Sequence, residues 1–357
     1  MDSQTPHPDA TRQPAANAVV PLSARKKLLF GGLTCLAVLG LLELAARLLA
    51  PPHSVDVYDE HRRLIEVAGL PALNEALEFD PVRFWKLKDS VRDLHVAGTL
   101  GRHAIDFRLT THDGRRSPPV SGKAAYRVLA IGDSCTFGVG VDDDESWPAM
   151  LQRQFERGGR TVEVINAGVP GYTAYQGRRY LESEGLALRP DVVVACFGFN
   201  DRDSWASRSD VETARLLASS GHDSPLMQSR LYAAIRRLLR DSGEPDENAA
   251  ARPRLSVIEF RDTLREIHGL CDQAGAKLVL LVWPFEPQVR QRVRELEPYQ
   301  QTVVTAGRRM NVPVINLVDA FIDSQRDGLF VDHIHAAPAG CRLAAEAIST
   351  ALAPPTP

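Results

Sequence analysis

The sequence has few of the patterns that mark disulfide-rich, nucleotide-binding or metal-binding proteins. Its 357 residues include an odd number of cysteines, with no CxxC pair and no metal-ligand spacing: Cys35, Cys135, Cys196, Cys271 and Cys341. We therefore expect buried free thiols and no disulfide framework. Glycines between residues 132 and 140 precede no Gly-Lys-Ser/Thr, which argues against a nucleotide site. We predict neither a metal ion nor a cofactor.

The sequence also lacks a strong excess of either charge. A formal net charge of -3, with charged residues at 24%, gives no reason to expect a nucleic-acid partner. Apolar residues make up 44%, which is ordinary for a globular protein. The acidic run at 142–145 could suggest a cation site. A solvated loop with its charges at a helix N-terminus explains that run better.

One apolar run is long enough to cross a bilayer. It covers residues 28–50 and contains two charges, Glu43 and Arg47, which form an i, i+4 pair near its end. We predict a transmembrane anchor at 26–50 after a disordered cytoplasmic tail at 1–25. A cleaved signal peptide and a buried amphipathic helix of a soluble protein are the alternatives.

The charges before this run predict its orientation. Arg25, Lys26 and Lys27 precede it, and positive residues favour the cytoplasmic side of a membrane. We therefore expect a single-pass protein with its N-terminus in the cytoplasm. The remainder would lie outside the cytoplasm, in the periplasm if the cell has an outer membrane.

A repeated pattern of strand, loop and helix begins near residue 125. Strands are predicted at 128–131, 162–165, 192–197, 278–282 and 314–317, and helices at 147–156, 174–186, 289–309 and 338–352. Alternation of this kind indicates a parallel sheet covered on both faces. We predict a three-layer α/β/α domain of flavodoxin-like type at 125–357.

Two further segments are less regular. Residues 51–124 are expected to form a juxtamembrane segment with short strands, including one at 105–110. Residues 203–254 form a polar insertion that is either a lid or a solvated surface excursion.

Residues suited to catalysis follow four of the predicted strands. Ser134 stands in Gly-Asp-Ser, Gly168 in Asn-Ala-Gly, Asn200 in Gly-Phe-Asn-Asp, and Asp332 and His335 in Asp-His-Ile-His. The carboxyl ends of parallel strands meet at one edge of a sheet, where α/β proteins bind ligands. In this order the four stretches resemble the blocks of the SGNH hydrolases, also called the GDSL-like esterase and lipase family, over about residues 127–352.

The resemblance implies a role for each residue. Ser134 would be the nucleophile, His335 its general base, and Asp332 the carboxylate that orients the imidazole. The backbone N–H groups of Ser134 and Gly168 and the side-chain amide of Asn200 would stabilise the negative oxygen that develops during ester cleavage.

Each of these residues also has a structural alternative. Ser134 could have no role beyond capping a helix. Gly168 could be a turn glycine, and Asn200 could be an ordinary loop cap. Asp133 and Asp201 are interpreted as hydrogen-bond acceptors that shape the turns.

Two neighbours compete for the catalytic roles. His333 is the competitor of His335, but the Asp-x-x-His spacing favours His335 and leaves His333 as a surface or substrate-facing residue. Cys135 places a thiol beside the nucleophile, and a cysteine nucleophile is the alternative to Ser134.

The sequence therefore predicts a serine esterase that acts outside the cytoplasm through an acyl-serine intermediate. Its substrate would be an acylated small molecule, lipid or polysaccharide carrying a short acyl group. An O-acyltransferase acting on a cell-surface polysaccharide would use the same residues. A membrane-tethered binding protein on this fold is the non-enzymatic alternative.

Overall fold

The computed structural model describes most of the chain. The described residues are 23–49, 56–100, 103–121, 126–204, 208–219, 229–232, 235 and 252–352. Nearly all of the predicted tail at 1–25 and a large part of the insertion at 203–254 lie outside them.

A parallel sheet forms the centre of the domain, as the sequence predicts. Its five strands are β5 (Tyr126–Gly132), β6 (Val162–Gly168), β7 (Val192–Cys196), β8 (Lys277–Val282) and β9 (Val314–Asn316). Their order is β6-β5-β7-β8-β9, and every neighbouring pair is parallel. This is the flavodoxin-like order, which confirms the predicted fold class.

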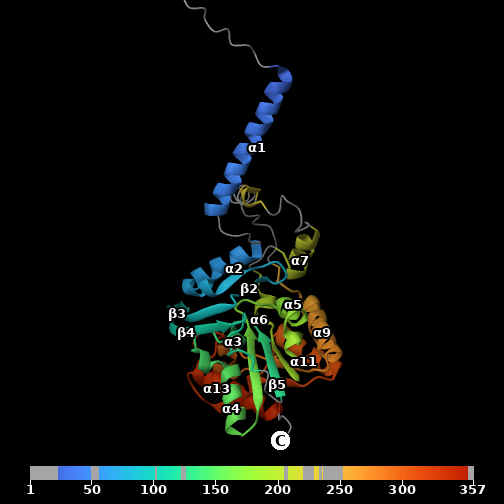
Figure 1. The fold of residues 1–357 in the computed structure, drawn as a ribbon. Coiled ribbons are helices and arrows are strands. Elements are labelled where there is room, and N and C mark those ends of the chain that lie inside the picture. The colour runs from blue at the N-terminus through green and yellow to red at the C-terminus, as the bar shows by residue number, and fades with distance from the viewer. Residues whose placement is uncertain are drawn as a thin grey trace, which may run out of the picture.

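Alternate residues of the strands enter two separate apolar clusters. Leu129 and Ile131 of β5 belong to one cluster, and Val128 and Ala130 to the other. Helices α5 (Ala174–Ser183), α9 (Val257–Gln273) and α11 (Pro298–Met310) cover the first face, and α4 (Trp147–Arg157) and α13 (Pro338–Leu352) cover the second (Figure 1). The sheet is buried on both faces, which explains its continuous apolar strands.

Several elements differ from the sequence prediction. The helix predicted at 289–309 is two helices, α10 (Glu286–Gln291) and α11, because Arg292 adopts a left-handed φ of 56° and Pro298 begins the second. The helix predicted at 174–186 ends at Ser183 and is followed by η3 (Gly185–Leu188). Helices α9 and α12 (Leu317–Ser324) were not predicted.

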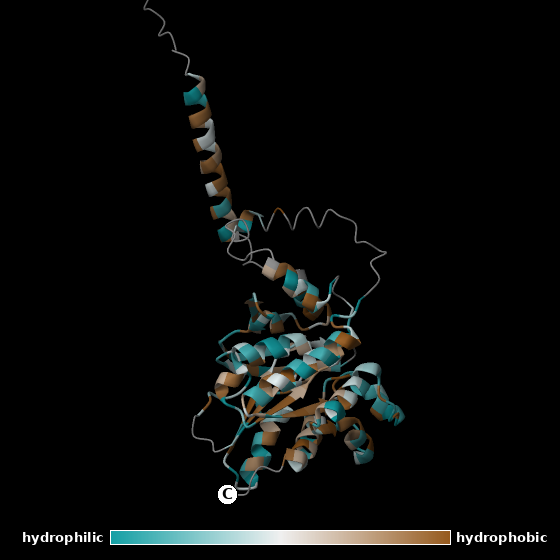
Figure 2. Cartoon of the chain, turned by 90° about the vertical axis from the view of Figure 1, so that its right-hand side faces the viewer, coloured by the Kyte–Doolittle hydropathy of each residue, from teal (hydrophilic) through white to brown (hydrophobic). Residues whose placement is uncertain are grey.

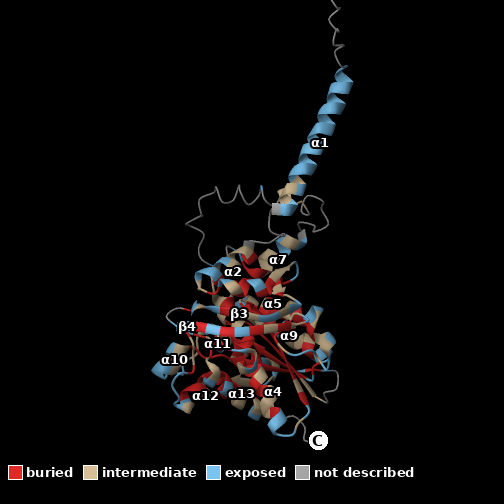
Figure 3. Cartoon of the chain, turned by 60° about the vertical axis from the view of Figure 1, so that its left-hand side comes forward, coloured by how far each residue is buried: buried red, intermediate tan, exposed pale blue. Residues whose placement is uncertain are grey.

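The region before the sheet is more ordered than its sequence suggests. It contains α2 (Asp56–Val67), η1 (Pro71–Ala76), the hairpin of β1 (Leu77–Asp80) and β2 (Phe84–Leu87), and the hairpin of β3 (Ser90–Leu100) and β4 (His103–His112). Side chains such as Trp85 and Phe107 are buried in the same apolar cluster as Leu129 and Ile131. Residues 56–112 therefore share a core with the sheet, and Figure 3 shows the buried residues continuing into β3.

The insertion leaves and re-enters the domain at one place. It follows α6 (Phe199–Arg202) and includes α7 (Asp210–Ser219). The N–H of Arg254 donates to the carbonyl of Asp203 at 2.9 Å, and the N–H of Leu255 donates to that of Asp201 at 2.9 Å. The ends of the insertion are thus held together directly after Asn200.

Helix α1 (Ala24–Leu49) extends away from the domain. Its side chains are mostly apolar and exposed (Figures 2 and 3). Among the described residues it is the one helix long and apolar enough to cross a membrane, a test that signal sequences also pass.

Candidate active site

The nucleophile candidate begins a short helix at the end of β5. Asp133 is the N-cap of α3 (Ser134–Phe137), because its Oδ1 accepts a hydrogen bond from the N–H of Cys135 at 2.9 Å. Ser134 is therefore the first helical residue and does not cap the helix. Gly132 lets the turn pack tightly, since a Cβ there would lie 2.1 Å from the Thr136 hydroxyl.

Ser134, His335 and Asp332 form a continuous chain of hydrogen bonds. The Oγ of Ser134 lies 2.8 Å from Nε2 of His335, although the two residues are 201 positions apart. The Nδ1 of His335 lies 2.8 Å from Oδ2 of Asp332. A carboxylate at Nδ1 favours the proton on that nitrogen and leaves Nε2 to accept the serine proton.

The carboxylate of Asp332 is fixed from a second direction. Its Oδ1 accepts hydrogen bonds from the N–H groups of Ile334 at 2.8 Å and His335 at 2.6 Å. Burial acts to raise the pKa of Asp332, but the hydrogen bond and charge of His335, together with the backbone N–H groups, outweigh it and lower this pKa to about 2. Asp332 therefore stays ionised at neutral pH.

The sequence around these residues matches a known family. The sequence model of the GDSL-like lipase/acylhydrolase family matches residues 130–343, which is more than half of the chain. The chain belongs to the GDSL-like lipase/acylhydrolase family. Ser134, Asn200, Asp332 and His335 all lie within the matched residues.

Two curated relatives match shorter stretches. The chain is 33% identical over 78 residues to esterase TesA of Pseudomonas aeruginosa, covering 22% of this chain and 39% of that protein. It is 31% identical over 81 residues to an arylesterase of Vibrio mimicus, covering 23% and 40%. The chain thus spans about two fifths of the length of these curated relatives.

Solved structures match a larger part of the chain at lower identity. A lipase/acylhydrolase from Enterococcus faecalis is 23% identical, with 64% of this chain and 95% of that chain covered and a TM-score of 0.42. The acetylxylan esterase Axe2 from Geobacillus stearothermophilus is 18% identical, with 64% and 94% covered and a TM-score of 0.41.

The structure does not support Gly168 as a donor to a substrate oxygen. Its N–H donates to Oδ1 of Asn166 at 3.0 Å, and Gly168 pairs with Gly132 as the last residue of β6. A Cβ at Gly168 would lie 2.3 Å from the backbone nitrogen of Phe137, so this glycine allows α3 to pack against β6. The prediction for Gly168 was wrong because the spacing did not show where its N–H points.

Asn200 is buried next to the nucleophile turn. Its Nδ2 donates to the carbonyl of Tyr172 at 3.1 Å and to Oδ2 of Asp133 at 3.3 Å. Burial raises the pKa of Asp133 to about 6. The longer of the two bonds is the one that a substrate oxygen could most easily replace.

Asp133 and Asp201 shape the turns, as interpreted from the sequence. Asp133 caps α3, and Asp201 accepts hydrogen bonds from the N–H groups of Ala174 at 2.8 Å and Gly198 at 2.9 Å. Asp201 therefore joins the start of α5 to the turn that carries Asn200.

His333 and Cys135 do not occupy the positions of base and nucleophile. The side chain of His333 is 62% exposed, and its Nδ1 lies 3.6 Å from Oδ2 of Asp332. Cys135 is buried, its Sγ lies 3.8 Å from the carbonyl of Ile334, and burial raises the pKa of its thiol well above the usual value. The other buried cysteines are likewise free thiols.

No pattern in the sequence indicated the buried arginine that supports the helix beginning at Ser134. The Arg116 guanidinium donates to the carbonyls of Phe137 at 3.1 Å, Gly138 at 2.6 Å and Val141 at 2.7 Å. It also pairs with Asp143 at 2.8 Å, inside the acidic run at 142–145. Among the described residues, no cluster of three or more His, Cys, Asp or Glu is arranged to hold a metal ion.

Replacing Asp332 with Asn should change how stability depends on pH. A carboxyl group whose pKa falls on folding stabilises the fold above its unfolded pKa, and loses this contribution as the pH falls through its folded pKa. The lowered pKa of Asp332 corresponds to about 2 kcal/mol at neutral pH, lost between about pH 4 and pH 2.

The measurement is the free energy of unfolding by urea at several pH values from 2 to 7. The deficit of Asp332→Asn should be largest at pH 7 and close to zero at pH 2. Asp144→Asn is the control, since it removes an exposed partner of Arg153 and should cost at most ~1 kcal/mol. A deficit that does not change with pH would contradict the prediction.

Proposed function

We propose that the chain hydrolyses esters through an acyl-serine intermediate. The observation that carries this proposal is the contact of 2.8 Å between Ser134 Oγ and His335 Nε2, with Asp332 bound to the other ring nitrogen. His335 takes the hydroxyl proton as Oγ attacks the carbonyl carbon, and returns it to the alcohol oxygen as that bond breaks. Water, activated by His335, then releases the acid from Ser134.

The developing oxyanion requires donors that are already in place. We assign this role to the backbone N–H of Ser134, the amide of Asn200 and, instead of Gly168, the N–H of Gly171. Within the part of the chain that the structure describes, the N–H of Gly171 has no acceptor. Asn200 donates to the carbonyl of the next residue, Tyr172, so Gly171 and Asn200 belong to one local arrangement.

A small cavity lined by Cys135, which follows Ser134 in the sequence, supports a short acyl group. It has a volume of about 20 Å³ and is lined by Cys135, Phe199, Trp283, Phe285 and Ile334, among others. Such a volume holds about one water-sized group. An acetyl methyl fits this cavity, whereas a long acyl chain does not.

A larger cavity, lined in part by two residues of the loop that carries His335, supports an ester with a bulky alcohol group. It has a volume of about 540 Å³ and is lined by Asp332, His333, Phe321 and the β3–β4 hairpin residues Leu100 and His103, among others. The alcohol leaves from the side of His335, which supplies its proton, and Asp332 and His333 are neighbours of His335 in the sequence.

We also propose that α1 anchors the protein and that the domain lies outside the cytoplasm. The apolar surface of α1 and the basic residues 25–27 at its start support this arrangement. At its far end, the Glu43 carboxylate accepts hydrogen bonds from the Ser229 hydroxyl at 2.7 Å and the N–H groups of Arg230 at 3.1 Å and Leu231 at 3.0 Å. These polar contacts fit an interface better than hydrocarbon.

Washing membranes with alkaline carbonate tests the anchor. The full chain should stay in the membrane fraction, because α1 is an integral span, and a chain lacking residues 1–50 should be released. A C-terminal reporter that functions only outside the cytoplasm should be active. Release of the full chain, or an inactive reporter, would contradict the anchor or its orientation.

Removing the nucleophile should abolish ester cleavage. Ser134→Ala should lower the turnover of p-nitrophenyl acetate by roughly 10⁶-fold, to the background rate, because the attacking group is gone. Cys135→Ala should keep most of the activity, since its buried thiol is not the attacking group. Circular dichroism checks that both variants are folded, and activity that follows Cys135 instead of Ser134 would overturn the mechanism.

Opening the small cavity should change the preferred acyl length. Phe285→Ala should raise the kcat/KM ratio of p-nitrophenyl octanoate to acetate by about tenfold or more, because a methylene is worth ~1–3 kcal/mol in an apolar pocket. Phe155→Ala is the control, since Phe155 is equally an apolar buried side chain and lines neither cavity. An unchanged ratio in Phe285→Ala would exclude this cavity as the acyl site.

A further inference from the structure

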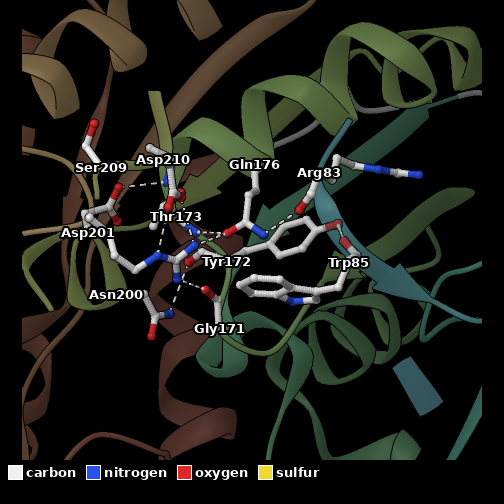
Figure 4. Close-up of polar contacts among 12 residues, drawn as sticks. Arg83, Trp85, Gly171, Tyr172, Thr173, Gln176, Asn200, Asp201, Ser209 and Asp210 are labelled. Carbon is white, nitrogen blue, oxygen red and sulfur yellow. Dashed lines mark hydrogen bonds and ion pairs between the residues drawn. The ribbon is translucent and has the colours of Figure 1, made fainter. Parts of the chain in front are cut away.

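The turn after β6 is held by side chains from three separate parts of the chain. The carbonyl of Pro170 accepts a hydrogen bond from Nε1 of Trp85 at 3.0 Å, and that of Gly171 accepts one from Nη1 of Arg254 at 2.6 Å. The carbonyl of Tyr172 accepts the bond from Asn200. Three consecutive carbonyl groups are thus fixed by an indole, a guanidinium and an amide. Figure 4 shows Trp85 and Asn200 around Gly171 and Tyr172 of this turn.

The first of these bonds fixes the direction of the N–H group of Gly171. A peptide bond is planar, and in its trans form the carbonyl and the following N–H point in opposite directions. The carbonyl of Pro170 and the N–H of Gly171 belong to the same peptide. Because Trp85 holds that carbonyl, the N–H of Gly171 must point away from Trp85.

Trp85 is itself held rigidly. Its side chain is fully buried, and its carbonyl accepts a hydrogen bond from the Tyr172 hydroxyl at 2.7 Å. The His61 ring stacks on the indole, with ring centroids 4.1 Å apart and planes within 9°. The guanidinium carbon of Arg254 lies 5.2 Å from the centre of the indole ring.

The residues around Gly171 leave no room for a side chain at this position. Its φ is 78°, and a Cβ would lie 2.0 Å from Nε2 of His61. Position 171 therefore lies directly against His61 of the N-terminal region.

Arg254 completes the arrangement from the end of the insertion. Its guanidinium pairs with Asp210 at 2.8 Å, and both side chains are fully buried. It also donates to Oε1 of Gln176 at 2.6 Å. With these partners in place, its remaining bond can hold the carbonyl of Gly171 in one position.

We propose that Trp85, supported by Arg254, is a positioning residue that aims the N–H of Gly171 at the oxyanion. Trp85 then takes part in the reaction through the orientation of one peptide group, without touching the substrate. This inference rests on the proposed esterase function and on Gly171 as an oxyanion donor.

The test removes the indole N–H and keeps an aromatic ring. Trp85→Phe should lower kcat for p-nitrophenyl acetate by about tenfold to a hundredfold, less than the 10²–10³ typical of deleting a donor outright, because a misaligned N–H keeps part of its effect. KM should change less than twofold. The concentration of active enzyme is measured by labelling with a fluorophosphonate until the reaction is complete, and each rate is divided by that concentration. A partly unfolded sample therefore does not lower the kcat obtained.

A transition-state analogue separates positioning from a merely structural role. An alkyl boronic acid forms a tetrahedral adduct on Ser134, and its inhibition constant should rise in Trp85→Phe by about the factor that kcat falls. Arg254→Lys keeps the positive charge beside Asp210 and should act in the same direction. Trp147→Phe is the control and should leave both values unchanged, since it removes a fully buried indole N–H that has no acceptor among the described residues and lines neither cavity.

If Trp85→Phe does not fold, benzothienylalanine at position 85 replaces the N–H by sulfur with nearly the same shape and should give the same losses. Wild-type kcat in either variant, or a fall in kcat with unchanged boronic acid affinity, would overturn the inference. These outcomes leave the esterase function intact. That function fails separately, if the unmodified protein cleaves no ester.

Discussion

The contact between the Ser134 hydroxyl and the His335 imidazole depends on the parallel pairing of the sheet. Each strand ends at the same edge, so the turn after β5 and the loop before α13 meet there across 201 positions of sequence. Tight packing of α3 against the strand ends fixes the position of this helix at that edge. Gly132 leaves room for Thr136, and Gly168 leaves room for the backbone of Phe137, so α3 lies directly on the ends of two adjacent strands. A side chain at either glycine would displace the helix that begins with Ser134.

The region before the sheet supports the site from behind. Arg116 binds the carbonyl groups that follow α3, and Trp85 binds the turn that follows β6. Both side chains are buried and donate hydrogen bonds to backbone carbonyl groups, so the loops that carry these carbonyls have few alternative conformations. The region before the sheet is thus packed into the domain that it precedes. Residues 56–116 contact the loops at the candidate site through buried hydrogen bonds and share an apolar core with the sheet.

The sequence allowed some of this to be predicted because buried parallel strands are continuous apolar runs. The motifs at their ends indicated Ser134, Asp332 and His335, whose side chains the structure joins by hydrogen bonds. Gly168 shows the limit of such reasoning, since spacing does not tell which way a peptide N–H points. In the region 56–112 the strand predicted at 105–110 lies within β4, but the other elements were not predicted. Strand β3 has a bulge between Val91 and Leu94, and the apolar residues of the region pack against partners distant in sequence.

The buried pair of Arg254 and Asp210 is better explained by the backbone groups that it holds in place than by a contribution to the stability of the fold. Replacing a buried ion pair with apolar residues of similar volume is often neutral or stabilising, because both charges lose their hydration. An apolar replacement could not, however, hold the carbonyl of Gly171.

Arg254 also closes the insertion, because its backbone N–H donates a hydrogen bond to the carbonyl of Asp203. One residue therefore joins the end of the insertion to the turn beside Asn200, and the position of that turn depends on where the insertion rejoins the domain.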